Sequence, residues 1–214
     1  MDIDARIKII MEKMEKLKDK NPEYSCGDFP PVWGKPIKEE RVASFEKKNG
    51  IKLPEDYRRF ITTVAGSCSQ PFYGMYSIFG NDPDDADISK KFKYTIENPL
   101  DIYKLSDEEY NNLNDEMVYA GFIFLCHEGC GMYSILIVNS DDQDTYGTVW
   151  YFDLANDAGT FPLLNPVDKK PMNFLDWLEY YADRTLELED EDFFGYAELT
   201  GPYYDDVPEE QAGK

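Results

Sequence analysis

The sequence predicts an α+β fold, in which a mostly antiparallel sheet of about four to six strands carries helices packed on one side. Helical periods occur in the first 66 residues and again after residue 173, whereas residues 119–164 hold apolar runs of strand length. Short turns separate these runs, and strands joined by short turns pair antiparallel. Together these observations favour one sheet with the helices grouped on one of its faces.

Charge is the strongest compositional signal. The 214 residues include 22 basic and 43 acidic ones, which leaves a formal net charge of −21. A polyanion is repelled by the nucleic acid backbone, so the composition argues against direct nucleic-acid binding. The same charge promotes solubility and accelerates the approach of a basic partner. A hydrophobic content of 42% is sufficient for a packed core.

The sequence carries no sign of export or membrane insertion. No apolar run approaches the roughly 20 residues of a membrane-spanning helix, and the N-terminus lacks a secretory signal. We therefore expect a cytoplasmic protein that does not contact membranes. In the cytosol thiols stay reduced, so four free cysteines are expected. They are Cys26, Cys68, Cys126 and Cys130.

Three parts are expected along the chain. Residues 1–36 hold a helix over residues 2–20 and a proline-rich loop, residues 37–186 hold the α+β domain, and residues 187–214 form an acidic and aromatic tail. The apolar residues of the first helix alternate spacings of four and three for only about two heptads, so we expect the helix to lie on its own domain. Those residues are Ile3, Ile7, Ile10, Met14 and Leu17.

Residues 50–66 are predicted to form the helix on which the rest of the fold packs. Pro54 suits a first helical position, and Gly66 is expected to end the helix in the left-handed conformation. Arg58 and Arg59 are expected on the outside. The apolar face follows the i, i+3, i+4, i+7 pattern and consists of Tyr57, Phe60, Ile61 and Val64.

The remaining elements follow from caps and alternation. Further helices are expected over residues 37–48, from the Ser106 capping box to about residue 117, and from the Asn173 cap onward. Strands are expected over residues 72–79, 119–126, 132–138, 148–153 and 160–164, the last at a sheet edge. The sequence does not assign residues 90–105 to a helix or a strand, because their apolar residues alternate only briefly.

The order of these elements resembles the SUKH superfamily, which includes a fungal cell-wall glucan-synthesis regulator and many bacterial immunity proteins. The resemblance covers about residues 37–185. The matching motifs are Phe45-Glu46, Gly50, Leu53-Pro54-Glu55-Asp56-Tyr57, Gly66, the hairpin around Gly129 and Gly131, Val149 to Asp153, and Phe174 with Trp177-Leu178. The turn residues His127, Glu128 and Cys130 and the long segment 82–105 depart from the family pattern.

This resemblance implies binding rather than catalysis. Bacterial members are mostly immunity proteins that bind and neutralise a cognate polymorphic or contact-dependent toxin. Many such toxins are nucleases, which are basic because they hold phosphates, and a net charge of −21 would attract them. The alternative is a regulatory or scaffolding module with an intracellular partner, as in the fungal branch. The oligomeric state stays open.

Acidic and aromatic residues outside the expected core are the candidate partner-binding residues. Solvated loop charge is the competing interpretation of the acidic loops, which lack the ligand spacing of an EF-hand. Phe193 and Phe194 are expected to fold back on the domain, whereas the tail tyrosines either do the same or contact the partner. The candidates are Asp82, Asp84, Asp85, Asp87, Asp141, Asp142, Asp144, Glu187, Glu189, Asp190, Glu191, Asp192, Tyr203 and Tyr204.

Motifs for catalysis or metal binding are incomplete. Cys126, His127 and Cys130, with Cys68 as a fourth ligand, suggest zinc, but the second ligand pair of a structural zinc site is missing. Neighbours in a strand point to opposite faces, so Cys126 and His127 do not form a nucleophile–base pair. We therefore expect no catalytic, cofactor-binding or metal-binding residue, and a metal-assisted hydrolase ranks last among the functions.

Overall fold

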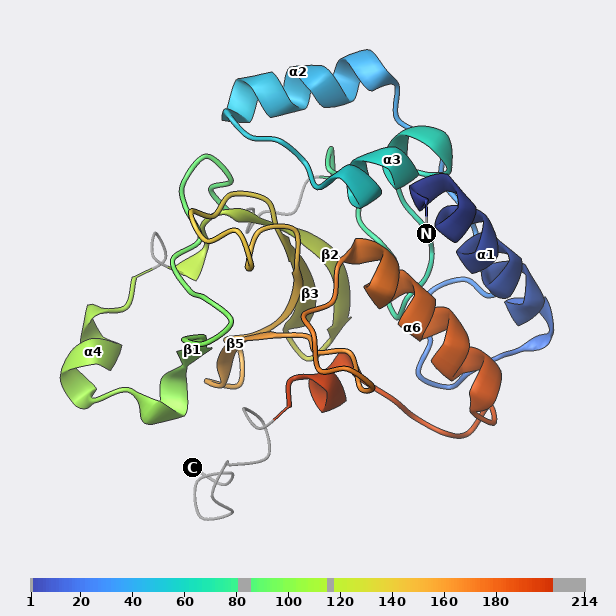
Figure 1. Ribbon diagram of the computed structural model, residues 1–214. Helices are drawn as coiled ribbons and strands as arrows, with labels where there is room; N and C mark the ends of the chain where they lie inside the picture. The colour runs from blue at the N-terminus through green and yellow to red at the C-terminus, as the bar shows by residue number, and fades with distance from the viewer. Residues whose placement is uncertain (1, 81–85, 115–117, 202–214) are drawn as a thin grey trace.

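The computed structural model describes residues 2–80, 86–114 and 118–201, which form a five-stranded sheet with flanking helices (Figure 1). The predicted α+β class is confirmed. The helices are α1 (Ile3–Lys16), η1 (Leu17–Asp19), α2 (Glu39–Asn49), α3 (Glu55–Thr63), η2 (Ile102–Lys104), α4 (Asp107–Asn112), α6 (Phe174–Glu187) and η3 (Tyr196–Leu199). Within the described segments, no helix has both the length and the apolar composition of a membrane span.

The sheet is antiparallel throughout and has the order β1-β5-β4-β3-β2. Its strands are β1 (Leu100–Asp101), β2 (Phe122–Gly129), β3 (Met132–Ile137), β4 (Val149–Asp153) and β5 (Gly159–Pro162). The prediction of an edge strand at residues 160–164 is wrong, because β5 lies between β4 and the short strand β1. The long strand β2 forms the opposite edge of the sheet.

Alternation along the strands divides the core into two layers. Ile123 and Leu125 of β2 pack with residues of α1, α3 and α6, which Figure 1 shows together on one side of the sheet. Phe122 and Phe124 pack into a second cluster, which is covered by segments between residues 86 and 119. Helices therefore occupy one face, as predicted, and mostly irregular chain covers the other.

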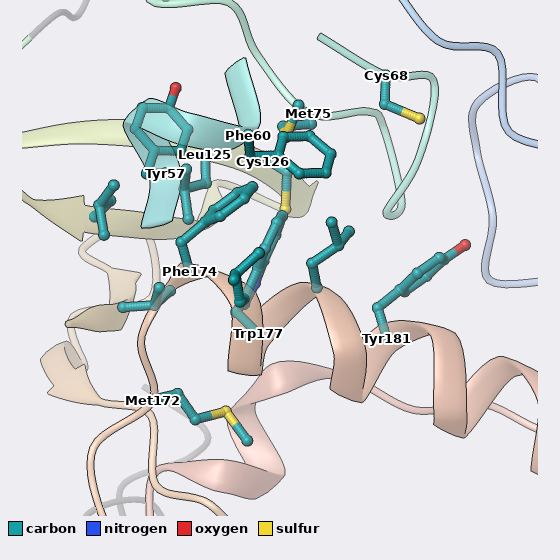
Figure 2. Close-up of a cluster of buried hydrophobic side chains, with 14 of the residues drawn as sticks. Tyr57, Phe60, Cys68, Met75, Leu125, Cys126, Met172, Phe174, Trp177 and Tyr181 are labelled. Atoms are coloured by element: carbon teal, nitrogen blue, oxygen red, sulfur yellow. The ribbon is translucent and has the colours of Figure 1, made fainter. Parts of the chain in front are cut away.

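Helix α3 lies at the centre of the helical layer. Tyr57 and Phe60 are fully buried, and their rings lie 4.9 and 5.2 Å from the ring of Phe174 on α6. Figure 2 shows this contact, with Trp177 and Leu125 in the same cluster. The predicted central role of this helix is confirmed, although Val64, its C-terminal cap, is only half-buried.

Two details at the ends of α3 differ from the prediction. Pro54 is the N-cap rather than the first helical residue. Gly66 is not the left-handed terminator, because α3 already ends at Val64. A Cβ at Gly66 would lie 2.5 Å from Cγ1 of Ile37, so close packing explains this glycine. The left-handed terminator is Gly50, at φ 67° after α2.

Helix α1 lies along α6 on the outer side of the helical layer. The buried side chains of α1 are Ile7, Ile10 and Met14. Two basic residues of α1 pair with acidic residues of α6: Arg6 Nη2 lies 2.5 Å from Asp176 Oδ1, and Lys13 Nζ lies 2.8 Å from Glu179 Oε1. The predicted capping box of α6, between Asn173 and Asp176, is present.

Residues 72–79 do not form the predicted strand. Phe72 (φ 48°) and Gly74 (φ 104°) turn the chain, and only Met75 makes isolated bridges, to Cys68 and Cys126. The apolar residues of this segment reflect burial, since Phe72 and Met75 are both in the core. Local alternation therefore indicated burial correctly and the backbone conformation incorrectly.

The chain after α6 folds back on the domain. Phe194 is buried as predicted, whereas Phe193 is 74% exposed, so that prediction is wrong for Phe193. Tyr196 in η3 is fully buried, and its hydroxyl donates to the carbonyl of Trp177 over 2.9 Å.

Candidate partner-binding site

Two loops, residues 86–92 and 139–147, lie side by side. Their backbones meet where Phe92 N donates to the Asn139 carbonyl over 2.8 Å. A salt bridge of 3.1 Å between Lys91 Nζ and Asp141 Oδ1 also joins them. The structure therefore brings Asp87 close to Asp141, Asp142 and Asp144, which follow it by more than fifty residues in sequence.

Two of these four carboxylates hold their own loops together. Asp87 Oδ1 accepts hydrogen bonds from Ser89, which lower the pKa of the Asp87 carboxyl. Asp142 accepts hydrogen bonds from the Thr145 hydroxyl and the Asp144 backbone N–H. Asp141 and Asp144 are exposed on the outside of the loop. They are the carboxylates here with the greatest access to a partner.

The acidic residues after α6 form a separate group. Figure 1 places the C-terminal end of α6 far from α2. Glu187 pairs with Arg184, and the Asp192 carboxylate accepts from the Glu189 backbone N–H. Asp190 is half-buried and Glu191 is exposed. Asp82, Asp84, Asp85, Tyr203 and Tyr204 lie outside the described residues.

A groove of about 990 Å³ lies between α2, β2 and the chain on either side of residues 81–85. Apolar side chains dominate its lining: Phe45, Tyr76, Ile78, Phe79, Ile88, Phe122, Ile123 and Phe124. Asp87 also lines the groove, which places the 86–92 loop at its border. The backbone carbonyl of Ile88 accepts a hydrogen bond from Asn139, so the 139–147 loop adjoins the same wall.

Aromatic contacts shape the groove where α2 meets the 76–80 segment. The rings of Phe45 and Phe79 meet edge to face with centroids 5.7 Å apart. The guanidinium of Arg41 lies 4.1 Å from the Phe79 ring centroid, a cation–π contact. Phe79 is still 38% exposed. Sequence reasoning missed this groove, because Phe79 ended a run that had the pattern of a strand.

A buried carboxylate fixes α2 to α3 and so sets the far wall of the groove. Only 3% of the Glu46 side chain is exposed. It accepts hydrogen bonds from the backbone N–H of Leu53 over 3.0 Å and from Nε of Arg58 over 3.2 Å. Arg58 is therefore half-buried in an ion pair, whereas the prediction placed it outside. Arg59 is exposed, as predicted, and pairs with Asp4.

Of the residues that suggested zinc, three lie on the β2–β3 hairpin and Cys68 lies on the chain after α3. Cys126 and Cys68 are buried, Cys130 is exposed, and the His127 ring lies 4.7 Å from the ring of Tyr133. In the segments that the structure describes, no three His, Cys, Asp or Glu side chains meet in a way that could hold a metal ion.

Next to them, Glu128 has a strongly perturbed carboxyl. Its Oε1 accepts from the Ser134 hydroxyl over 2.7 Å, and its Oε2 accepts from the backbone N–H of Tyr196 over 3.3 Å. Burial raises the pKa of Glu128 from 4.5 to about 8. The Ser134 hydroxyl also accepts from the Trp177 indole over 3.0 Å. These contacts join the hairpin, α6 and the C-terminal segment inside the core, so we assign Glu128 a structural role.

Comparison with known protein families gives a match. The model of the SMI1 / KNR4 family (SUKH-1) matches residues 36–180, which is more than half of the chain. This match confirms the resemblance to the SUKH superfamily. No curated protein and no solved structure matches the chain. Both main walls of the groove, α2 and β2, lie inside the matched range, whereas α1 and the chain after α6 extend mostly beyond it.

Proposed function

The chain belongs to the SMI1 / KNR4 family (SUKH-1), and we propose that it is a cytoplasmic immunity protein that binds and neutralises a cognate toxin. Family membership supports a protein-interaction module of the immunity type. The partner we propose is a basic domain, most simply a nuclease, because such a domain complements a net charge of −21.

The groove between α2 and β2 carries this proposal. A concave apolar surface of about 990 Å³ with an exposed phenylalanine is typical of a binding site, since exposed apolar patches on soluble proteins mark contact surfaces. Interface hot spots are enriched in aromatic residues and arginine, and Phe79 with Arg41 provides both.

The acidic loops complement the groove. Asp141 and Asp144 are exposed on the loop whose Asn139 bonds the Ile88 carbonyl at the groove, so we assign them to the contact with basic side chains of the toxin. The group from Glu187 to Asp192 lies elsewhere, and we assign it to long-range attraction rather than to contact. Neutralisation then results from covering the toxin's phosphate-binding surface with this acidic border.

A growth experiment tests the function. The product of the neighbouring reading frame in the source genome is expressed in a bacterial host with and without this chain. We expect that product to arrest growth alone and the chain to restore it. We also expect a purified complex whose association rate falls as salt is raised, because charge attraction accelerates the encounter.

Three results count against parts of the proposal in different ways. A complex with a non-toxic neighbour would favour the regulatory module over the immunity protein. A toxic neighbour that neither binds the chain nor is neutralised by it would refute the assigned partner. An association rate that does not change with salt concentration would contradict the role assigned to the acidic loops.

A further inference from the structure

The direction of hydrogen bonds in the sheet shows which backbone groups of β2 face the groove. Ile137 of β3 donates to Thr148 and accepts from Gly147, so its backbone groups face β4. Its partner on β2 is Phe122, whose N–H and C=O therefore face away from β3. The same alternation applies two residues further, where Ile135 pairs with Phe124.

On both sides of residues 122–124, other parts of the chain form backbone hydrogen bonds with the outer edge of β2. Tyr76 N donates to the Leu125 carbonyl over 2.7 Å on one side, and Gly121 N donates to the Asp87 carbonyl over 3.1 Å on the other. Between them, no backbone group of the described residues bonds the N–H or C=O of Phe122 or Phe124. Both residues line the groove. A row of strand-forming groups therefore faces an apolar cavity.

An edge that no described residue pairs with is a template for another strand. The opposite wall of the groove is α2. Its Phe45 contacts Phe79 of the 76–80 segment, so this segment rather than β2 closes the groove against α2. The groove thus has a hydrogen-bonding edge on one side and apolar side chains on the other. An extended peptide matches this combination, because its backbone pairs with the edge and alternate side chains enter the cavity.

The charged residues around the groove indicate which side chains the bound peptide carries. Glu40 and Asp87 lie on its walls, and the exposed Asp141 and Asp144 lie on the adjoining loop. The basic residues that line it are Arg41, which lies over the Phe79 ring, and Lys48. Apolar side chains alternating with basic ones would fill the cavity and reach the acidic border.

We propose that an extended segment of the partner protein, with apolar side chains alternating with basic ones, enters this groove and adds a strand to the outer edge of β2 at Phe122 and Phe124. The inference rests on the proposed function and specifies how the partner is held. It also explains why β2, the longest strand, stands at a sheet edge beside a groove instead of being covered along its whole length.

Amide hydrogen exchange on the full-length protein tests this strand addition. The probe is the purified toxin domain encoded by the neighbouring reading frame, and the readout is residue-resolved NMR of wild-type protein. We expect the amides of Phe122 and Phe124 to become about tenfold or more better protected in the complex. The amide of Ile123, which faces β3, is the internal control and is expected to change far less.

A pair of variants tests the same point by removing one backbone donor of β2. Phe124→Ala and Phe124→Pro both remove the ring, but only the proline also removes the outward N–H, which an edge strand tolerates. We expect the proline variant to bind about tenfold more weakly than the alanine variant. Circular dichroism establishes that both variants are folded before the affinities are compared.

The outcomes separate the binding mode from the function. A complex that leaves the Phe122 and Phe124 amides unprotected overturns strand addition and leaves the immunity function intact. Absence of any complex refutes the proposed function as well. Equal affinities of folded Phe124→Ala and Phe124→Pro variants also contradict strand addition.

Discussion

The buried carboxyl of Glu128 makes stability depend on pH in a defined direction. Its pKa is about 8 in the folded protein and 4.5 in the unfolded chain, so the folded state holds the proton more tightly. The resulting stabilisation is complete below pH 4.5 and is lost as the pH rises to about 8. The causes are burial, which dominates, and the nearby negative charge of Asp153.

The size of the effect follows from the shift in pKa. Between pH 5 and pH 9 the ionisation of Glu128 lowers the free energy of unfolding by about 4 kcal/mol. A Glu128→Gln variant lacks this ionisation and keeps an amide that can pair with Ser134 and Tyr196. We therefore compare the free energy of unfolding of the variant with that of the wild type at each pH. We expect this difference to be about 4 kcal/mol more in favour of the variant at pH 9 than at pH 5.

Urea unfolding followed by tryptophan fluorescence at pH 5 and pH 9 measures this difference. Trp177 lies beside the network, so its emission reports on the loss of the contact with Ser134. Glu12→Gln, on an exposed part of α1, is the control for losing one negative charge. The reasoning is refuted if the stability difference between Glu128→Gln and the wild type is the same at both pH values.

Three further variants test contacts between the helices. Glu46→Ala leaves the buried N–H of Leu53 without its acceptor and is expected to cost about 1–3 kcal/mol. Arg59→Ala, which breaks an exposed ion pair, is expected to cost less than about 1 kcal/mol, and thermal unfolding of both variants compares them directly. Phe174→Ala removes a fully buried ring from the α3–α6 contact and is expected to cost about 3–5 kcal/mol by urea unfolding, whereas a cost below about 1 kcal/mol would contradict the packing described.

Features carried by local spacing could be predicted from the sequence. The helix around Tyr57 and Phe60, the hairpin of β2 and β3, and both capping boxes depend on residues a few positions apart. Apolar period and capping chemistry act over that range, so the predictions agree with the structure.

Features set by distant contacts could not be predicted in this way. The composition of residues 72–79 predicts a strand, because alternation reports burial, but the positive φ of Phe72 turns the chain. Its place after the apolar face predicts Gly66 as a helix end, but the role of Gly66 depends on Ile37, which lies nearly thirty residues away in sequence. The groove is lined by α2, Phe79 and β2, which are far apart in the sequence, so no local sequence pattern predicts it. The candidate residues Asp87 and Asp141 came from composition, and only the fold shows that they lie together beside that groove.

The most direct test of the central claim, that the groove between α2 and β2 binds the partner, is a calorimetric titration with the neighbouring gene's product. Ser44→Trp places a large side chain in the groove, whereas Ala43→Trp places the same side chain one position away on α2, outside it. We predict that the wild type and Ala43→Trp bind with equal affinity and that Ser44→Trp binds about tenfold or more weakly. Equal affinity for all three proteins would contradict the claim.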